Sequence, residues 1–161
     1  MRPARPFITC ISVNIPDILP LISETFSVNF RDNRKAMTEN DKKLLAADNE
    51  GLANYEYLAN HIDDIDADMD FIIENLRRTD LSGQYLASAS RYLNAIDPER
   101  FGDAIRRMVA LTIDRDREHR FIGDLIVSLY GDDYQERASE LSAADNNFRR
   151  MYKRLYPNSP I

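Results

Sequence analysis

Apolar residues between Leu52 and Arg78 follow one another at alternating spacings of three and four. This stripe consists of Tyr55, Leu58, Ile62, Ile65, Met69, Ile72 and Leu76. Such a period places all of these side chains on one face of an α-helix. The pattern predicts a long helix that continues back to Glu39, unless the chain breaks at residues 49–51, where Gly51 is a weak helix former.

Start and stop signals indicate further helices on both sides of this segment. Thr38 and Asp41 have the spacing of a capping box, and Asp97 followed by Pro98 is typical of a helix start. Residues 79–83 read as a turn. The expected buried faces of the next two helices are Leu86, Ala89, Leu93 and Ile96, then Phe101, Ile105, Met108 and Thr112.

Residues 114–120 are all charged or titratable, and the pattern leaves two interpretations open. They lie either inside one helix over residues 98–130 or in an exposed turn. Farther on, Gly131 resembles a helix C-cap, and Asp145 is a possible start for a separate last helix. No internal repeat is apparent in the sequence.

These segments predict an all-α fold, a single-domain helical bundle of five to seven helices with at least one long helix. The bundle is expected to cover residues 15–157. Residues 1–14 are expected to form a short extended N-terminal arm, and residues 158–161 a tail.

Composition narrows the class of protein. The 161 residues are 43% apolar and 30% charged, which is typical of a globular chain, and the net charge of −6 argues against a nucleic-acid binder. No run of 18 apolar residues predicts a membrane-spanning helix. The single Cys10 excludes an internal disulfide, so a cytoplasmic location is expected.

Charge is unevenly distributed along the chain. Residues 39–74 carry a net charge of −9, whereas residues 145–156 carry +3. We therefore expect the acidic helix to pack beside the basic one. Arginines outnumber lysines by 17 to 4, and arginine favours bidentate ion pairs with carboxylates between helices.

The acidic residues of the long predicted helix are the first candidate site. They are Glu56, Asp63, Asp64, Asp66, Asp68, Asp70 and Glu74. Like charges four residues apart destabilise a helix slightly, so this face is either solvated or compensated by neighbouring arginines, a basic partner or a metal ion. The first hypothesis is a non-enzymatic protein-binding module, an adaptor, inhibitor or neutralising partner, that presents this face to a basic protein surface.

A metal-dependent hydrolase of phosphoester or nucleotide substrates is the second hypothesis. The spacing of three residues between a histidine and a carboxylate occurs twice, and the candidate ligands of a divalent metal are His61, Asp64, Asp116 and His119. This reading requires one continuous helix over residues 98–130 that faces His61. Under the first hypothesis no cofactor and no catalytic residue are expected.

The third hypothesis is a structural subunit. A stripe that persists for three heptads can serve as the seam of a homodimer rather than as part of an intramolecular core.

Overall fold

The computed structural model describes residues 37–160, so the predicted arm at residues 1–14 lies outside the described residues. Between residues 37 and 160 the chain is all-helical, with eight α-helices where five to seven were expected. These are α1 (Glu39–Ala46), α2 (Leu52–Asn60), α3 (Met69–Thr79), α4 (Gln84–Ile96), α5 (Gly102–Arg115), α6 (Ile122–Tyr130), α7 (Ala138–Ala144) and α8 (Asn146–Leu155). Two short 3₁₀ helices, η1 (Ile65–Asp68) and η2 (Asp132–Gln135), complete the described part.

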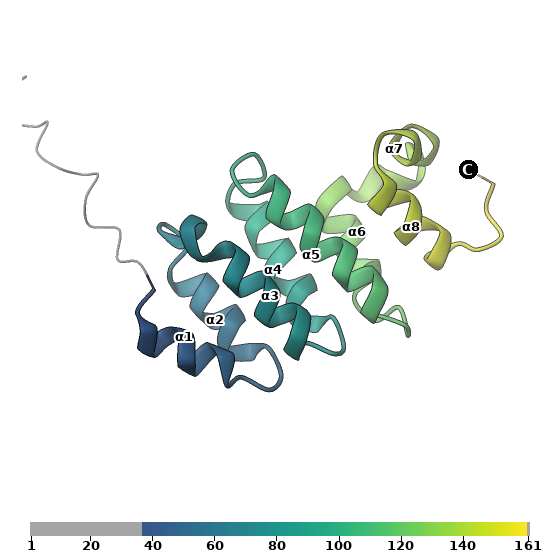
Figure 1. Ribbon diagram of the computed structural model, residues 1–161. Coiled ribbons are helices and arrows are strands. Elements are labelled where there is room, and N and C mark those ends of the chain that lie inside the picture. Colours follow the sequence, from purple (N-terminus) through teal and green to yellow (C-terminus); the bar gives the residue numbers. More distant parts are fainter. Residues whose placement is uncertain (1–36, 161) are drawn as a thin grey trace, which may run out of the picture. The chain divides into compact units, whose positions relative to one another are not determined.

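Most of these helices pack as three hairpins stacked side by side. The hairpins are α2 with α3, α4 with α5, and α6 with α8. Helices α2, α4 and α6 contact one another in order and form the A row, while α3, α5 and α8 form the B row. Figure 1 shows the two rows next to each other. This is the layered arrangement of helical-repeat proteins, and the predicted single bundle is not confirmed.

The predicted long helix is interrupted twice. The break near Gly51, one of the two alternatives, is present between α1 and α2, but a second break separates Asn60 from Met69. At this second break the chain reverses so that α3 packs against α2. The stripe remains buried nevertheless, because both helices turn the same apolar face to one core.

The core follows the predicted apolar positions closely. Leu58, Ile65, Ile72 and Leu76 are at most 1% exposed. Of the expected faces on α4 and α5, every residue is buried except Ile96, which is 51% exposed. Because these four side chains of the stripe lie in the interior of the described hairpins, they are not available as the seam of a homodimer.

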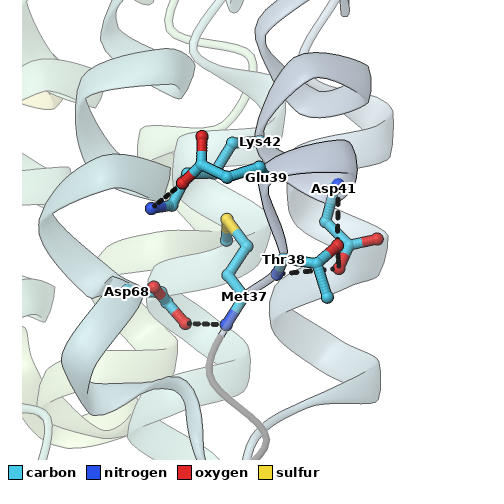
Figure 2. Close-up of polar contacts among 6 residues, drawn as sticks. All are labelled: Met37, Thr38, Glu39, Asp41, Lys42 and Asp68. Atoms are coloured by element: carbon cyan, nitrogen blue, oxygen red, sulfur yellow. Dashed lines mark hydrogen bonds and ion pairs between the residues drawn. The ribbon is translucent and has the colours of Figure 1, made fainter.

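Capping explains where α1 begins. The Thr38 hydroxyl accepts a hydrogen bond from the Asp41 amide at 3.1 Å, and the Asp41 carboxylate accepts one from the Thr38 amide at 3.1 Å (Figure 2). These reciprocal bonds satisfy two amides that lack partners within the helix, so the predicted capping box is confirmed.

The loops that lead into the three hairpins share a device that the sequence pattern did not reveal. Asp48, Asp80 and Asp116 each follow a helix and accept backbone amides of the next A-row helix. In each loop one of these amides lies six residues after the aspartate, at 2.8–3.2 Å from a carboxylate oxygen. Hence the run at residues 114–120 is a turn, and α5 ends at Arg115.

The same loops need a left-handed residue three positions after the aspartate. Gly51 has φ +100° and Gly83 has φ +83°, whereas the third loop uses His119 at φ +58°. A side chain destabilises this conformation, so His119 is the least favourable of the three.

Replacing His119 with glycine should therefore stabilise the protein. We expect a gain of about 0.5 kcal/mol, because relief of left-handed strain exceeds the extra entropy that glycine gives the unfolded chain. Urea unfolding followed by circular dichroism measures the change. A loss of stability would instead show that the imidazole makes a contact that outweighs the strain.

Arginines join each hairpin to the preceding helix end. Arg78 of α3 donates to the carbonyl of Ala46, and Arg115 of α5 donates to the carbonyl of Asp80 at 2.8 Å. Arg154 of α8 donates to the carbonyl of Ile113. Because carbonyls at a helix C-terminus lack partners within the helix, these guanidinium groups satisfy them and also lie at the negative end of the dipole.

Asp48 gives this scaffold a dependence on pH. Burial raises the pKa of its carboxyl, but hydrogen bonds from Asn54, from the amides of Glu50 and Gly51 and from the Asn54 amide outweigh burial and lower the pKa below 3.8. The carboxylate therefore stabilises the fold above the ordinary pKa, and this stabilisation is lost as pH falls through the lowered value.

We expect wild type to be more stable than Asp48→Asn at about pH 6, and the difference to shrink below about pH 4. Urea midpoints of both proteins across this range measure it. A difference that does not change with pH would contradict the assignment.

Candidate functional site

The acidic residues predicted to share one helix face are distributed over α2, the second break and α3. Two of them are ion-paired to α5 or to the turn before it in the next hairpin. The Asp66 carboxylate accepts a hydrogen bond from Arg100 Nε at 3.1 Å, and the Asp70 carboxylate lies 2.5 Å from a terminal guanidinium nitrogen of Arg107. Compensation by arginines of a neighbouring hairpin, one of the explanations open from sequence, is therefore present.

Two further carboxylates also have partners. Glu74 pairs with Arg77 at 2.5 Å, and Asp68 accepts the Met37 amide at 3.1 Å (Figure 2). For Glu56, Asp63 and Asp64 the carboxylates form no hydrogen bond or ion pair with residues 37–160. Only three of the seven predicted binding residues are thus left without such a partner.

Helix α5 lies between the acidic and basic segments. It contacts α3 on one side and α8 on the other, and Arg150 of α8 lies 2.5 Å from Asp114 of α5. The expectation that the acidic helix packs beside the basic one is therefore wrong. Helix α5 supplies a cation to one neighbour and an anion to the other, so each charge is compensated locally.

The four candidate metal ligands are not assembled into a site. Both oxygens of buried Asp116 accept backbone amides, those of Arg120, Phe121 and Ile122 at 2.7–2.9 Å. His61 stacks on Tyr57 with ring centroids 4.0 Å apart. The described residues contain no group of three or more His, Cys, Asp or Glu placed to hold a metal ion.

The continuous helix that the hydrolase hypothesis needed is also missing. Helix α5 ends at Arg115 and α6 begins at Ile122, so residues 98–130 bend at Asp116. The reason is the capping carboxylate, which binds amides of the following helix and fixes the turn.

Charge separates the two rows of helices sharply. The charged residues of the A row are Glu56, Arg91 and Asp124, one in each helix. Each B-row helix carries four or five charged residues. The A row thus has the composition that protein interfaces favour, tyrosine-bearing and poor in charge.

A hollow of about 570 Å³ lies on the A row. It is lined by Tyr55 of α2, by Ser88, Arg91, Tyr92, Asn94 and Ala95 of α4, and by Ser128 of α6. All three hairpins contribute to it. Arg91 is the only charged residue in this lining.

Internal hydrogen bonds hold part of the lining in place. The Tyr92 hydroxyl donates to the Ala59 carbonyl at 3.2 Å and ties α4 to α2. The Asn94 amide donates to the Ser128 carbonyl at 3.0 Å and ties α4 to α6. The floor of the hollow is therefore preorganised by the stacking of the hairpins.

Sequence reasoning gave this surface no role, although a signal was present. The segments 84–96 and 122–130 carry one charge each in a chain that is 30% charged. Two neighbouring helices that contain tyrosine and few charged residues indicate a surface that is covered by other residues of the chain or shared with a partner.

Comparison of the chain with protein families, with curated proteins and with solved structures gives no match. Among the helices from residue 39 to residue 155, none combines the length and the apolar character required to cross a membrane.

Proposed function

We propose that this chain is a non-enzymatic protein-binding module that engages its partner through the A row. The observation that carries the proposal is the charge difference between the rows. Charged side chains of the B row pair with each other across hairpins, whereas the A row presents tyrosine, serine and alanine around a hollow. Stacked helical hairpins commonly bind proteins along one such row.

The acidic residues support the proposal less strongly than the hollow does. Asp66, Asp70 and Glu74 already bind arginines of this chain, so a basic partner would have to displace those ion pairs. Asp63 and Asp64 stay the better candidates for contact with a basic surface, since their carboxylates are not paired and they lie between α2 and η1, outside the A row. They form the second candidate surface of the same binding module.

Capture of partners from an extract of the source cells tests both surfaces. Ala95→Arg places a long cation in the hollow, and Ala143→Arg adds the same side chain at an exposed position of α7, outside the hollow and the acidic residues. We expect proteins captured by wild type to be lost with Ala95→Arg and retained with Ala143→Arg.

Charge reversal distinguishes the second surface. The double variant Asp63→Lys with Asp64→Lys removes two unpaired carboxylates outside the A row without changing a residue of the internal ion pairs. Loss of capture by this variant alone would move the binding surface to the acidic residues. Equal capture by all variants would contradict a partner site on either surface. Circular dichroism confirms that each variant is folded.

A further inference from the structure

The guanidinium group of Arg91 differs from those of most other described arginines in its lack of a hydrogen-bond or ion-pair partner. Every arginine of the B-row helices has a hydrogen-bond or ion-pair partner, either on a neighbouring helix or loop, as for Arg107 and Arg115, or within its own helix, as for Arg106. Within residues 37–160 only Arg91 and the loop residue Arg117 have guanidinium groups without a hydrogen bond or ion pair. Of these two, Arg91 lies in the middle helix of the A row, in the lining of the hollow.

We propose that Arg91 binds a carboxylate of an Asp or Glu side chain on a peptide segment of the partner. This inference rests on the proposed function of the A row and names the chemistry that the hollow recognises. A guanidinium presents a planar fork of donors that matches both oxygens of a carboxylate. The neutral lining next to Arg91 supplies no competing anion.

A second donor lies in the same hollow. The hydroxyl of Tyr55 forms no hydrogen bond with the described residues, whereas the Tyr92 hydroxyl and the Asn94 side-chain amide already join α4 to its neighbours. Tyr55 comes from α2 and Arg91 from α4, so the two free donors stand on adjacent hairpins. The hollow thus offers a bound segment one unpaired donor from each of two adjacent hairpins.

The surroundings restrict the partner further. Ser88 and Ala95 are small, and they let a peptide backbone approach α4 closely. Glu56 and Asp124 lie on the same row outside the hollow and repel additional negative charge. The preferred segment thus carries one carboxylate flanked by neutral residues, rather than a run of acidic residues.

A random-peptide phage library selected on the immobilised full chain tests this inference. Selections are run on wild type, on Arg91→Glu and on the control Arg106→Glu, which changes an exposed arginine of the B row. We expect wild type and the control to enrich peptides with one central Asp or Glu. Arg91→Glu should enrich peptides with Lys or Arg at that place.

Fluorescence polarisation with one enriched peptide then gives the magnitude. Arg91→Glu, or replacement of the peptide glutamate by glutamine, should weaken binding by about tenfold to a hundredfold, the range for a charge-assisted hydrogen bond. Tyr55→Phe should weaken binding less, because it removes one neutral donor.

Two results would overturn the inference, and neither depends on the capture experiment. Enriched peptides without Asp or Glu that bind Arg91→Glu as well as wild type would show that the hollow recognises something other than a carboxylate. Failure to enrich any peptide on wild type would show that the hollow does not bind a short segment. The proposed function fails separately, when Ala95→Arg leaves capture of partners unchanged.

Discussion

Replacing Asp80 with alanine should destabilise the protein more than any other single change of a polar residue considered in this structure. The carboxylate is 1% exposed and accepts the amides of Gly83 at 2.9 Å, Gln84 at 3.1 Å and Leu86 at 2.8 Å. Alanine would leave buried donors of α4 without partners and remove a cap. We expect a loss of about 3–5 kcal/mol, where a whole domain has about 5–15 kcal/mol.

Denaturation by urea, followed by circular dichroism, measures this loss. Asp80→Asn is the matched variant of equal size: it keeps one acceptor oxygen and places an amide donor against another donor, so a loss of about 1–3 kcal/mol is expected. Asp103→Ala, at an exposed position in the first turn of α5, should change stability by no more than about 0.5 kcal/mol. A stability for Asp80→Ala within about 1 kcal/mol of wild type would show that the loop is held by other contacts.

Replacing Gly51 with alanine is expected to have the second largest effect. The residue has φ +100°, and a Cβ there would lie 3.1 Å from Leu76, 3.1 Å from Tyr85 and 3.2 Å from Asp80. These atoms belong to α3, to α4 and to the next loop, so the methyl group would press the first two hairpins apart. We expect a loss of about 2–3 kcal/mol from backbone strain and overpacking together.

Gly123→Ala provides the matched control for this prediction. Gly123 lies inside α6, and no atom comes within 4 Å of a Cβ built there. The same chemical change should therefore stabilise the protein by about 0.5–1 kcal/mol, since alanine is the better helix former. Urea midpoints of the two variants should move in opposite directions, and a shift of both in the same direction would contradict the packing described for Gly51.

The sequence pattern predicted burial better than it predicted connectivity. Leu58, Ile65 and Ile72 are buried as their spacing indicated, because a helical stripe faces the core whether or not the helix continues. The break after Asn60 was missed, since residues 61–68 contain neither glycine nor proline. Helix α2 nevertheless ends there and the chain turns through η1, so tertiary packing decides the ending.

The repeated hairpins were missed for a related reason. The loops share little beyond Asp48, Asp80 and Asp116, which lie 32 and 36 residues apart, and the third loop replaces the glycine with His119. The sequence also predicted a different candidate site, for another reason. A sequence pattern marks charged residues, whereas the lining of the hollow is uncharged except for Arg91.

The stacking of hairpins also bears on how the chain reaches its fold. Each hairpin pairs helices that are neighbours in sequence or nearly so, and each row joins a hairpin mainly to the next one. Such contacts close short loops, which favours rapid folding over slow searches for distant partners. The hairpin of α4 and α5 has neighbours on both sides, so we expect it to form first and order to spread outward to α2 and α3 and to α6 and α8.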